Sequence, residues 1–176
     1  MRAAARNQPG NPDRVRMREI SLDRTFVSDE TGVKIQYPSS WQRLDLMQET
    51  PPLTLVTMFL SNEEHPTGVR QNINLVVEDL PSALSLPEYT DLGIAMEKEF
   101  FDHYAVLKSE DVLLAGAYHA HRVFFTASLN GGDMTFEQIW LLKDKKALVW
   151  TFADSADVFG QHVTTFERMM DTMTVR

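Results

Sequence analysis

Cysteine is the first absence in this sequence of 176 residues. Without it the chain has no disulfide, no thiolate metal ligand, no thiol nucleophile and no cysteine for a lipid anchor. The lack of cysteine fits a reducing compartment, although many periplasmic domains lack cysteine too. We therefore expect a core held together by packing alone.

Long apolar runs are missing as well. No stretch approaches the roughly 20 apolar residues of a transmembrane helix, so we expect no membrane span. Residues 1–18 are basic but contain no continuous apolar segment of the kind that a secretory signal requires. The sequence as written predicts a cytoplasmic protein that starts at Met1 or Met17. The alternative is a mature fragment of a periplasmic or thylakoid-lumen-like protein.

Positive charge is scarce outside the N-terminus. The formal net charge is −8, yet residues 1–18 hold five arginines against Asp13, which leaves −12 on the remainder. An acidic body lacks the clustered Lys and Arg that track phosphates, so we expect no nucleic-acid partner. The N-terminal segment is rich in Ala, Asn, Gly and Pro besides arginine, and this composition predicts a flexible basic leader over residues 1–20.

Catalytic signatures are absent too. The chain has no Gly-rich phosphate loop, no nucleophile elbow and no helical His-Glu-x-x-His, so we expect no enzyme and no cofactor. One arrangement is an exception, because His119 and His121 would point to the same side of a strand and could share a metal. A third ligand is missing nearby, unless Asp144 lies across from His119. A small-ligand or metal-binding domain using His119 and His121, with weak hydrolase activity, is therefore the alternative function.

The most informative pattern runs from Ala117 to Met173, which predicts three antiparallel strands and a helix. Gly131-Gly132 marks the first hairpin and Asp144-Lys145 the second. The first turn would place Phe125 opposite Gln138 and Val123 opposite Trp140. The second would place Ile139 opposite Trp150.

Both faces of this ribbon are apolar. One face collects Val123, Phe125, Ala127, Leu129, Met134, Phe136, Trp140, Leu142 and Val149, and the other collects Phe124, Ile139, Leu141, Leu148, Trp150 and Phe152. Each face needs a covering layer, so we predict an α+β domain with helices on both faces of an antiparallel sheet, an α/β/α sandwich. The alternative is an apolar face left open for a partner.

A single domain over residues 21–176 accommodates the remaining elements. Patterning predicts strands at 24–27, 33–37, 53–60, 73–77 and 106–114, with Trp41 in the core. Ser85 and Glu88 predict the capping box of a helix that ends near His103. Its apolar stripe is Tyr89, Leu92, Met96 and Phe100, with Glu97, Lys98 and Glu99 outside. A second helix opens around Asp154 or Ser155 and buries Phe159, Val163, Phe166, Met170 and Met173.

Several local strings resemble those of a known family. They are Val33-Lys34-Ile35-Gln36-Tyr37-Pro38-Ser39-Ser40-Trp41, Asn72-Ile73-Asn74-Leu75-Val76-Val77, Leu86-Pro87-Glu88-Tyr89, Leu113-Leu114-Ala115-Gly116, Val149-Trp150-Thr151-Phe152-Ala153, Phe159 and Phe166-Glu167-Arg168-Met169-Met170. Over roughly residues 24–175, their order resembles the PsbP-like/DcrB-like superfamily, which includes the Ran-binding Mog proteins. The resemblance implies a sheet between helices and an accessory or chaperone-like binding role, without a catalytic motif. Unlike the exported lipoprotein members, this chain has neither signal nor lipid-accepting cysteine.

The expected function is therefore a non-catalytic protein-binding module of a larger assembly. Its acidic body predicts a more basic protein partner, bound more weakly as salt rises. The polar segment Ser61 to Arg70, with Glu63 and Glu64, is the expected contact loop. The oligomeric state is left open.

Overall fold

We describe the protein from a computed structural model, over residues 20–46, 53–64, 70–129 and 131–176. The predicted leader falls almost entirely outside these residues, so the division into leader and domain stays a prediction. The described chain opens at Ile20, whose carbonyl oxygen accepts a 2.8 Å hydrogen bond from Arg168. No helix in these ranges is long and apolar enough to cross a membrane.

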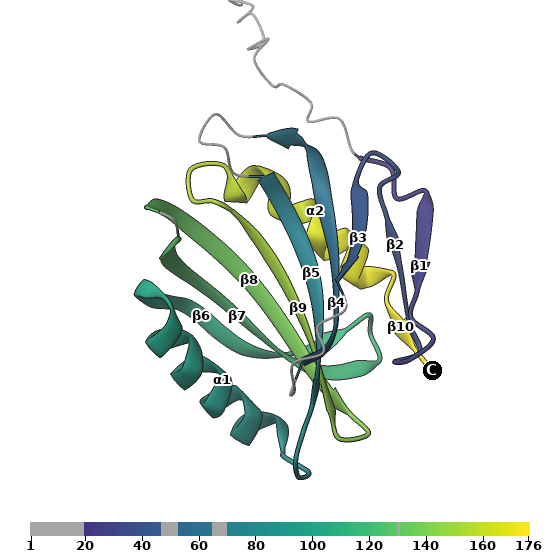
Figure 1. Cartoon of the computed structure of the whole chain (residues 1–176), viewed down its shortest axis with the longest axis vertical. Coiled ribbons are helices and arrows are strands. Elements are labelled where there is room, and N and C mark those ends of the chain that lie inside the picture. The colour runs from purple at the N-terminus through teal and green to yellow at the C-terminus, as the bar shows by residue number, and fades with distance from the viewer. Residues whose placement is uncertain (1–19, 47–52, 65–69, 130) are drawn as a thin grey trace, which may run out of the picture.

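The centre of the fold is an antiparallel sheet of seven strands (Figure 1). In spatial order its strands are β3 (Gln42–Leu46), β4 (Leu53–Glu64), β5 (Arg70–Asp79), β9 (Lys146–Ser155), β8 (Gly132–Lys143), β7 (Tyr118–Leu129) and β6 (Asp102–Leu114). Strands β5 to β9 were largely predicted from their patterning. Strand β3 was not, because its short alternation Gln-Arg-Leu-Asp-Leu carries little apolar surface.

A second sheet and two helices complete the described fold. The small sheet joins β1 (Arg24–Val27), β2 (Val33–Tyr37) and β10 (Thr174–Val175), and the helices are α1 (Leu86–Phe100) and α2 (Phe159–Asp171). Strands β1 and β2 have the predicted ranges. Their separation from the main sheet, and their closure by the chain end at β10, depend on contacts between segments far apart in sequence.

The two hairpins of the ribbon show how far local turn chemistry fixes register. Leu141 pairs with Leu148 and Ile139 with Trp150, as the Asp144-Lys145 turn predicts. The first hairpin is shifted by two residues, because Phe125 pairs with Phe136 instead of Gln138. A two-residue shift leaves every side chain on its predicted face, since side chains alternate with a period of two.

The sheet separates two apolar clusters, which we call the α2-side core and the α1-side core. The α2-side core contains the predicted face with Ile139, Trp150 and Phe152, together with Phe166 and Met170 of α2. The α1-side core contains the face with Phe125 and Trp140, together with Tyr89 of α1. Trp41 is buried in the α2-side core, as predicted.

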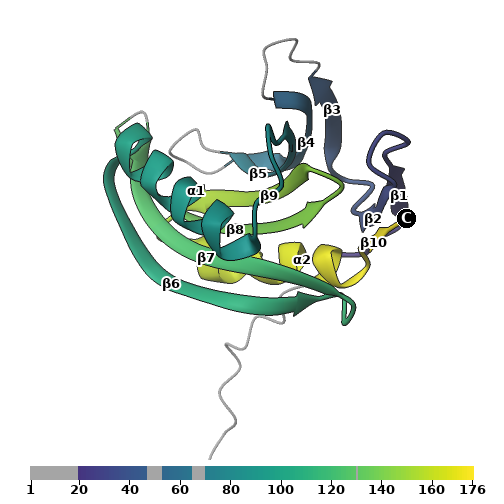
Figure 2. The ribbon, with the colours of Figure 1, turned by 90° about the horizontal axis from the view of Figure 1, so that it is seen from below.

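The covering layers differ from the predicted sandwich. Helix α2 shares its side of the sheet with β1 and β2, whose Phe26, Val33 and Ile35 are part of the same core. Helix α1 contacts β6 and β7 and lies along that margin of the sheet, on the other side of the central strands from α2 (Figures 1 and 2). The structure is α+β and mostly antiparallel, but a helical layer that covers each face is not confirmed.

The start of the second helix also differs from the prediction. Asp154 and Ser155 continue β9 and pair with Thr135 and Met134, while α2 begins at Phe159. The Asp154 carboxylate is buried and lies 2.7 Å from His162 Nδ1 of α2. It also accepts hydrogen bonds from the Ser155 backbone and from Gln71. Asp154 therefore ties β9 to α2 instead of capping the helix.

Candidate functional site

Helix α1 begins where the sequence predicts. The Ser85 side chain accepts a hydrogen bond from the Glu88 backbone, and the Ser85 backbone donates one of 2.8 Å to the Glu88 carboxylate. The Ser85 hydroxyl also donates a 2.6 Å hydrogen bond to the Glu88 carboxylate. The donors from the Ser85 hydroxyl and backbone together lower the pKa of Glu88. The capping box fixes the first turn, with Pro87 inside it.

Trp140 of β8 fixes the rotation of α1 about its axis. Its indole nitrogen donates a 2.9 Å hydrogen bond to Thr90 Oγ1, and the Tyr89 ring meets the indole edge-on at 5.9 Å. Gly93 lies over the same ring, which a Cβ at that position would approach to 3.6 Å. The absence of a side chain at Gly93 lets the helix backbone approach the sheet closely. Thr90 and Gly93 therefore face the sheet.

Glu97 lies on this inward side as well, contrary to the prediction. Its carboxylate accepts a 2.9 Å hydrogen bond from the Tyr104 hydroxyl of β6. Burial raises the pKa of Glu97 to about 7, despite the opposing effect of the Tyr104 hydrogen bond. An acidic side chain thus lies on the side of α1 that faces the sheet, where we had predicted apolar residues.

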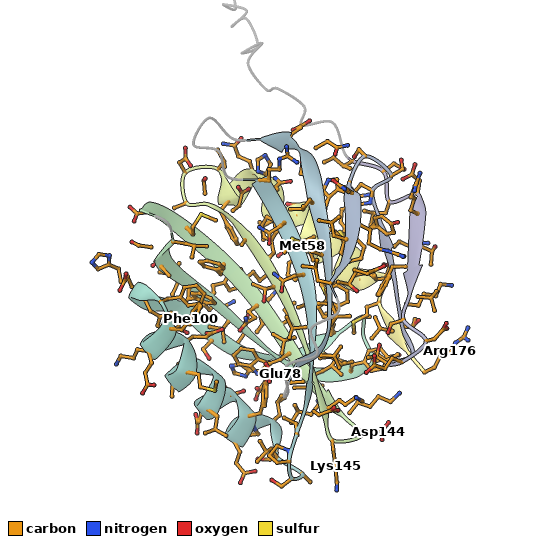
Figure 3. All side chains as sticks on the ribbon, viewed as in Figure 1. Met58, Glu78, Phe100, Asp144, Lys145 and Arg176 are labelled. Carbon is orange, nitrogen blue, oxygen red and sulfur yellow. The ribbon has the colours of Figure 1, made fainter. Side chains whose placement is uncertain are left out.

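The predicted stripe of α1 lies on the outside. Tyr89 is buried as expected, but Leu92, Met96 and Phe100 are 54%, 70% and 78% exposed. The prediction that these three residues are buried was wrong. The contacts of Thr90, Gly93 and Glu97 hold a different side of the helix against the sheet. We call Leu92, Met96 and Phe100 the outer stripe of α1. Figure 3 labels Phe100 at the end of α1 that lies next to β6.

Strand β6, which α1 contacts, forms the margin of the sheet. It is an edge strand, and its exposed apolar residues are Val106, Leu107 and Leu113. Its pairing with β7 is interrupted between Asp102 and Ala105 and again between Val106 and Lys108. Such irregularities and charged side chains discourage the addition of another strand at a free edge.

The two histidines of the alternative function have different environments. His119 is exposed, whereas the His121 side chain is only 12% exposed and stacks on Trp140 at 5.8 Å. The pairing of β7 with β8 extends only as far as His121 and Trp140, so it does not bring Asp144 to His119. Within the described residues no group of three His, Cys, Asp or Glu side chains could hold a metal ion.

His121 has partners on β6 that the sequence did not reveal. Its Nε2 lies 2.8 Å from Ser109 Oγ, and its Nδ1 lies 2.7 Å from Asp111 Oδ1. This order of hydrogen bonds is that of a serine–histidine–aspartate triad. The antiparallel register produces it, because Asp111 is directly opposite His121 and Ser109 is two residues away on the same face. Spacing along the chain alone could not predict the contact.

The surroundings of this trio do not favour catalysis. The Asp111 side chain is 82% exposed and Ser109 is exposed, so water has access to both hydrogen bonds. A triad accelerates acyl transfer in a site that excludes water and aims donors at the developing oxyanion. The same hydrogen bonds also join β6 to β7, and this structural role is enough to explain the trio.

The predicted contact loop is shorter than expected. Ser61 to Glu64 extend β4, and Glu64 pairs with Arg70 at the start of β5. The centre of the predicted loop, residues 65–69, lies outside the described residues. Glu63 is exposed on the described strand. Asn72 and Asn74 share the α1 side of β5, as the alternation predicts.

Glu137 is a buried carboxylate on the other side of the sheet. Its side chain is 0% exposed, and neither carboxylate oxygen has a hydrogen-bond partner among the described residues. Burial raises its pKa to about 7, partly opposed by Arg122, whose Nη1 lies 3.5 Å away, and reinforced by Glu167. Arg122 has a closer contact, a 2.6 Å ion pair with Glu110. Glu137 is therefore an energetic cost inside the fold.

A cavity of about 370 Å³ lies elsewhere, between the β1–β2 turn, the β8–β9 turn and Arg176. Its lining includes the cations Lys34 and Lys143 and the anions Asp29 and Glu30. This mixture does not select a ligand of one charge. Neither histidine lines it, so it gives no support to the small-ligand alternative as predicted.

Several solved structures share this architecture. Cyanobacterial PsbP (CyanoP) from Synechocystis sp. PCC 6803 superposes with a TM-score of 0.64 at 12% identity, over 87% of this chain and 92% of that one. LpqN of Mycobacterium tuberculosis gives 0.66 at 12%, over 86% and 89%. The Ran-binding protein Mog1p of Saccharomyces cerevisiae gives 0.55 at 8%, over 88% and 96%.

The chain has the fold of these solved structures. The resemblance seen in the sequence is thereby confirmed at the level of fold. No protein-family profile and no curated protein matches the sequence. At 8–12% identity the superpositions show the fold alone, so the site must be argued from the residues of this chain.

Proposed function

We propose that this protein is a non-catalytic binding module that docks on a protein partner through the outer stripe of α1. The observation that carries the proposal is the exposure of Leu92, Met96 and Phe100 on a helix whose other side is anchored to Trp140. Single exposed apolar residues are ordinary, but three at steps of four form a continuous apolar surface. Such a surface gains free energy when a partner removes it from water.

The fold relatives support this proposal by their described roles. Mog1p is described as a Ran-binding protein, and LpqN as involved in cell envelope biogenesis. Neither description names a reaction. A role as an accessory subunit of a larger assembly therefore agrees with both the fold and the exposed stripe.

The test starts with a tagged protein used to isolate the partner from the native source. The purified partner is then titrated by calorimetry against the wild type, L92S/M96S and H119A/H121A. We expect L92S/M96S to weaken binding by about tenfold or more, as for central apolar contacts, and H119A/H121A to leave it unchanged. Loss of binding in H119A/H121A, or loss of a metal from it, would favour the ligand-binding alternative.

The compartment is part of the same proposal. We propose a location in the cell envelope from the likeness to LpqN, which is involved in cell envelope biogenesis, with the cytoplasm as the alternative. Fractionation of the native cells, followed by detection of the protein with an antibody, separates these two locations. The partner should be recovered in the same fraction.

A further inference from the structure

We infer that the partner segment seated on α1 is a cationic amphipathic helix. This inference rests on the proposed function and adds the chemistry of the partner. Three independent features of the α1 surface lead to it: the spacing of its apolar side chains, the charges beside them and the condition of the neighbouring strand edge.

The spacing of the outer stripe suits a helix. Leu92, Met96 and Phe100 recur every four residues over about 12 Å of helix, given a rise of about 1.5 Å per residue. A second helix laid beside α1 can place its own i, i+3, i+4 and i+7 side chains between them. A segment with this period would cover all three at once.

The charges beside the stripe select the sign of the partner. Glu88 precedes Leu92 by four residues and Glu99 follows Met96 by three, so both lie next to the stripe on the helix surface. Both are exposed, as is Asp91. Lys98 is the single cation within α1. Lys or Arg residues on the flank of the partner helix would meet this acidic margin.

The same charges disfavour two other occupants. A second copy would bring Glu88 and Glu99 against their own counterparts, in addition to the acidic charge of the whole body. An anionic lipid surface is bound by helices with Lys and Arg beside the apolar face, which is the opposite pattern. The basic leader of this chain carries arginines but no periodic apolar residues, so it cannot cover the stripe as an amphipathic helix would.

The neighbouring edge disfavours an extended peptide. Strand addition to β6 would need a regular free edge, but the pairing of β6 is interrupted at two points. Lys108 and Glu110 form a 2.7 Å ion pair on this strand, which adds charge along the same edge. The helix face is therefore the better docking surface of the two.

The probe for this inference is a fluorescent peptide of about 18 residues, five helical turns, with leucine at the i, i+3, i+4 and i+7 positions and lysine elsewhere. Fluorescence anisotropy measures its binding to the full chain. The comparison peptides have the same composition in scrambled order, or glutamate in place of lysine. We expect the lysine helix to bind most tightly, with affinity that falls as the ionic strength rises.

Five variants locate the binding. L92S/M96S should weaken it by about tenfold, whereas L46S, which removes an exposed leucine from β3, should leave it unchanged. E99K should weaken binding more than E63K, because Glu63 lies on β4, which β5, β9 and β8 separate from the strands that α1 contacts. Far-ultraviolet circular dichroism checks that each variant is folded, and F100S provides a second test of the stripe.

Several results would overturn the inference. Two results would show attraction to the acidic body without a docked helix. One is that the scrambled peptide binds as tightly as the lysine helix. The other is that L92S/M96S and F100S each bind the lysine helix as tightly as the wild type does. Tighter binding of the glutamate peptide would contradict the charge argument. Stripe-dependent binding to phosphatidylglycerol vesicles, or a stripe-dependent dimer in sedimentation, would assign the surface to a membrane or to a second copy. The titration with the native partner tests the binding function separately.

Discussion

The indole nitrogen of Trp140 donates a 2.9 Å hydrogen bond to the Thr90 hydroxyl, and both residues are buried. This bond links the central sheet to α1 and helps to set which side of the helix faces outward. Thr90→Val keeps the shape of the side chain but leaves the indole N–H without its acceptor. We expect a loss of about 1–3 kcal/mol in the free energy of unfolding.

Denaturant unfolding of T90V and T90S measures this loss. T90S retains the hydroxyl and should lose less stability than T90V. If the two variants were equally stable, the hydrogen bond would not be what holds α1 against the sheet.

Trp150 provides a contrast to Trp140, because it lies in the other core and its indole nitrogen has no hydrogen-bond partner among the described residues. Trp150→Ala should cost about 3–5 kcal/mol, the range for truncating a buried large aromatic residue. Trp150→Phe should cost less than Trp140→Phe, since only the second change breaks a hydrogen bond. Denaturant midpoints of the three variants test this order, and an unchanged midpoint for Trp150→Ala would refute the two-core arrangement.

Glu137 makes the stability depend on pH. Its pKa is raised from 4.5 to about 7 in the folded state, so between these values the folded protein binds more protons than the unfolded chain. Stability therefore falls as the pH rises through this window, by on the order of 1–3 kcal/mol for this group. Glu137→Gln removes the titrating group and should flatten the fall.

Urea unfolding of wild type and E137Q at several pH values from about 4.5 to 8 tests this slope. Glu97, with a pKa raised to about 7, contributes in the same direction, so E97Q/E137Q should be flatter still. Parallel curves for wild type and the double variant would show that neither carboxylate carries the effect.

The basic leader should contribute nothing to the stability of the domain. Residues 1–18 have no periodic apolar pattern, and Ile20, which accepts the hydrogen bond from Arg168, lies outside the deleted segment. We expect the melting temperature to remain nearly unchanged after the deletion. A drop of several degrees, measured by calorimetry, would mean that the leader docks on the body or on another subunit.

The Ser109–His121–Asp111 trio should be structural. Wild type and S109A should hydrolyse p-nitrophenyl acetate at the same slow rate, because the exposed Ser109 and Asp111 leave the site open to water. Mass spectrometry after treatment with a fluorophosphonate probe provides a second readout. Modification of Ser109 that exceeds the modification of Ser40, an exposed serine in a turn, would establish an activated nucleophile.

Sequence alone determined the parts of this fold that depend on neighbours along the chain. The Ser85–Glu88 capping box, the Asp144-Lys145 turn and the alternation that sorts Trp140 and Trp150 onto opposite faces are local features. Even the error of two residues in the first hairpin preserved the faces, since side chains repeat every two residues. The lack of cysteine and of catalytic motifs is likewise a property of the sequence itself.

Tertiary structure decided what the site is made of. The spacing of Tyr89, Leu92, Met96 and Phe100 predicts an apolar stripe but does not say whether the sheet or a partner covers it. Trp140 decides between these two arrangements. Its hydrogen bond to Thr90 and its close approach to Gly93 hold the side of α1 with Thr90 and Gly93 against the sheet, so that the stripe faces outward. The contact of His121 with Ser109 and Asp111 likewise follows from the β6–β7 register. Both outcomes depend on packing between segments distant in sequence, which periodicity along one element cannot specify.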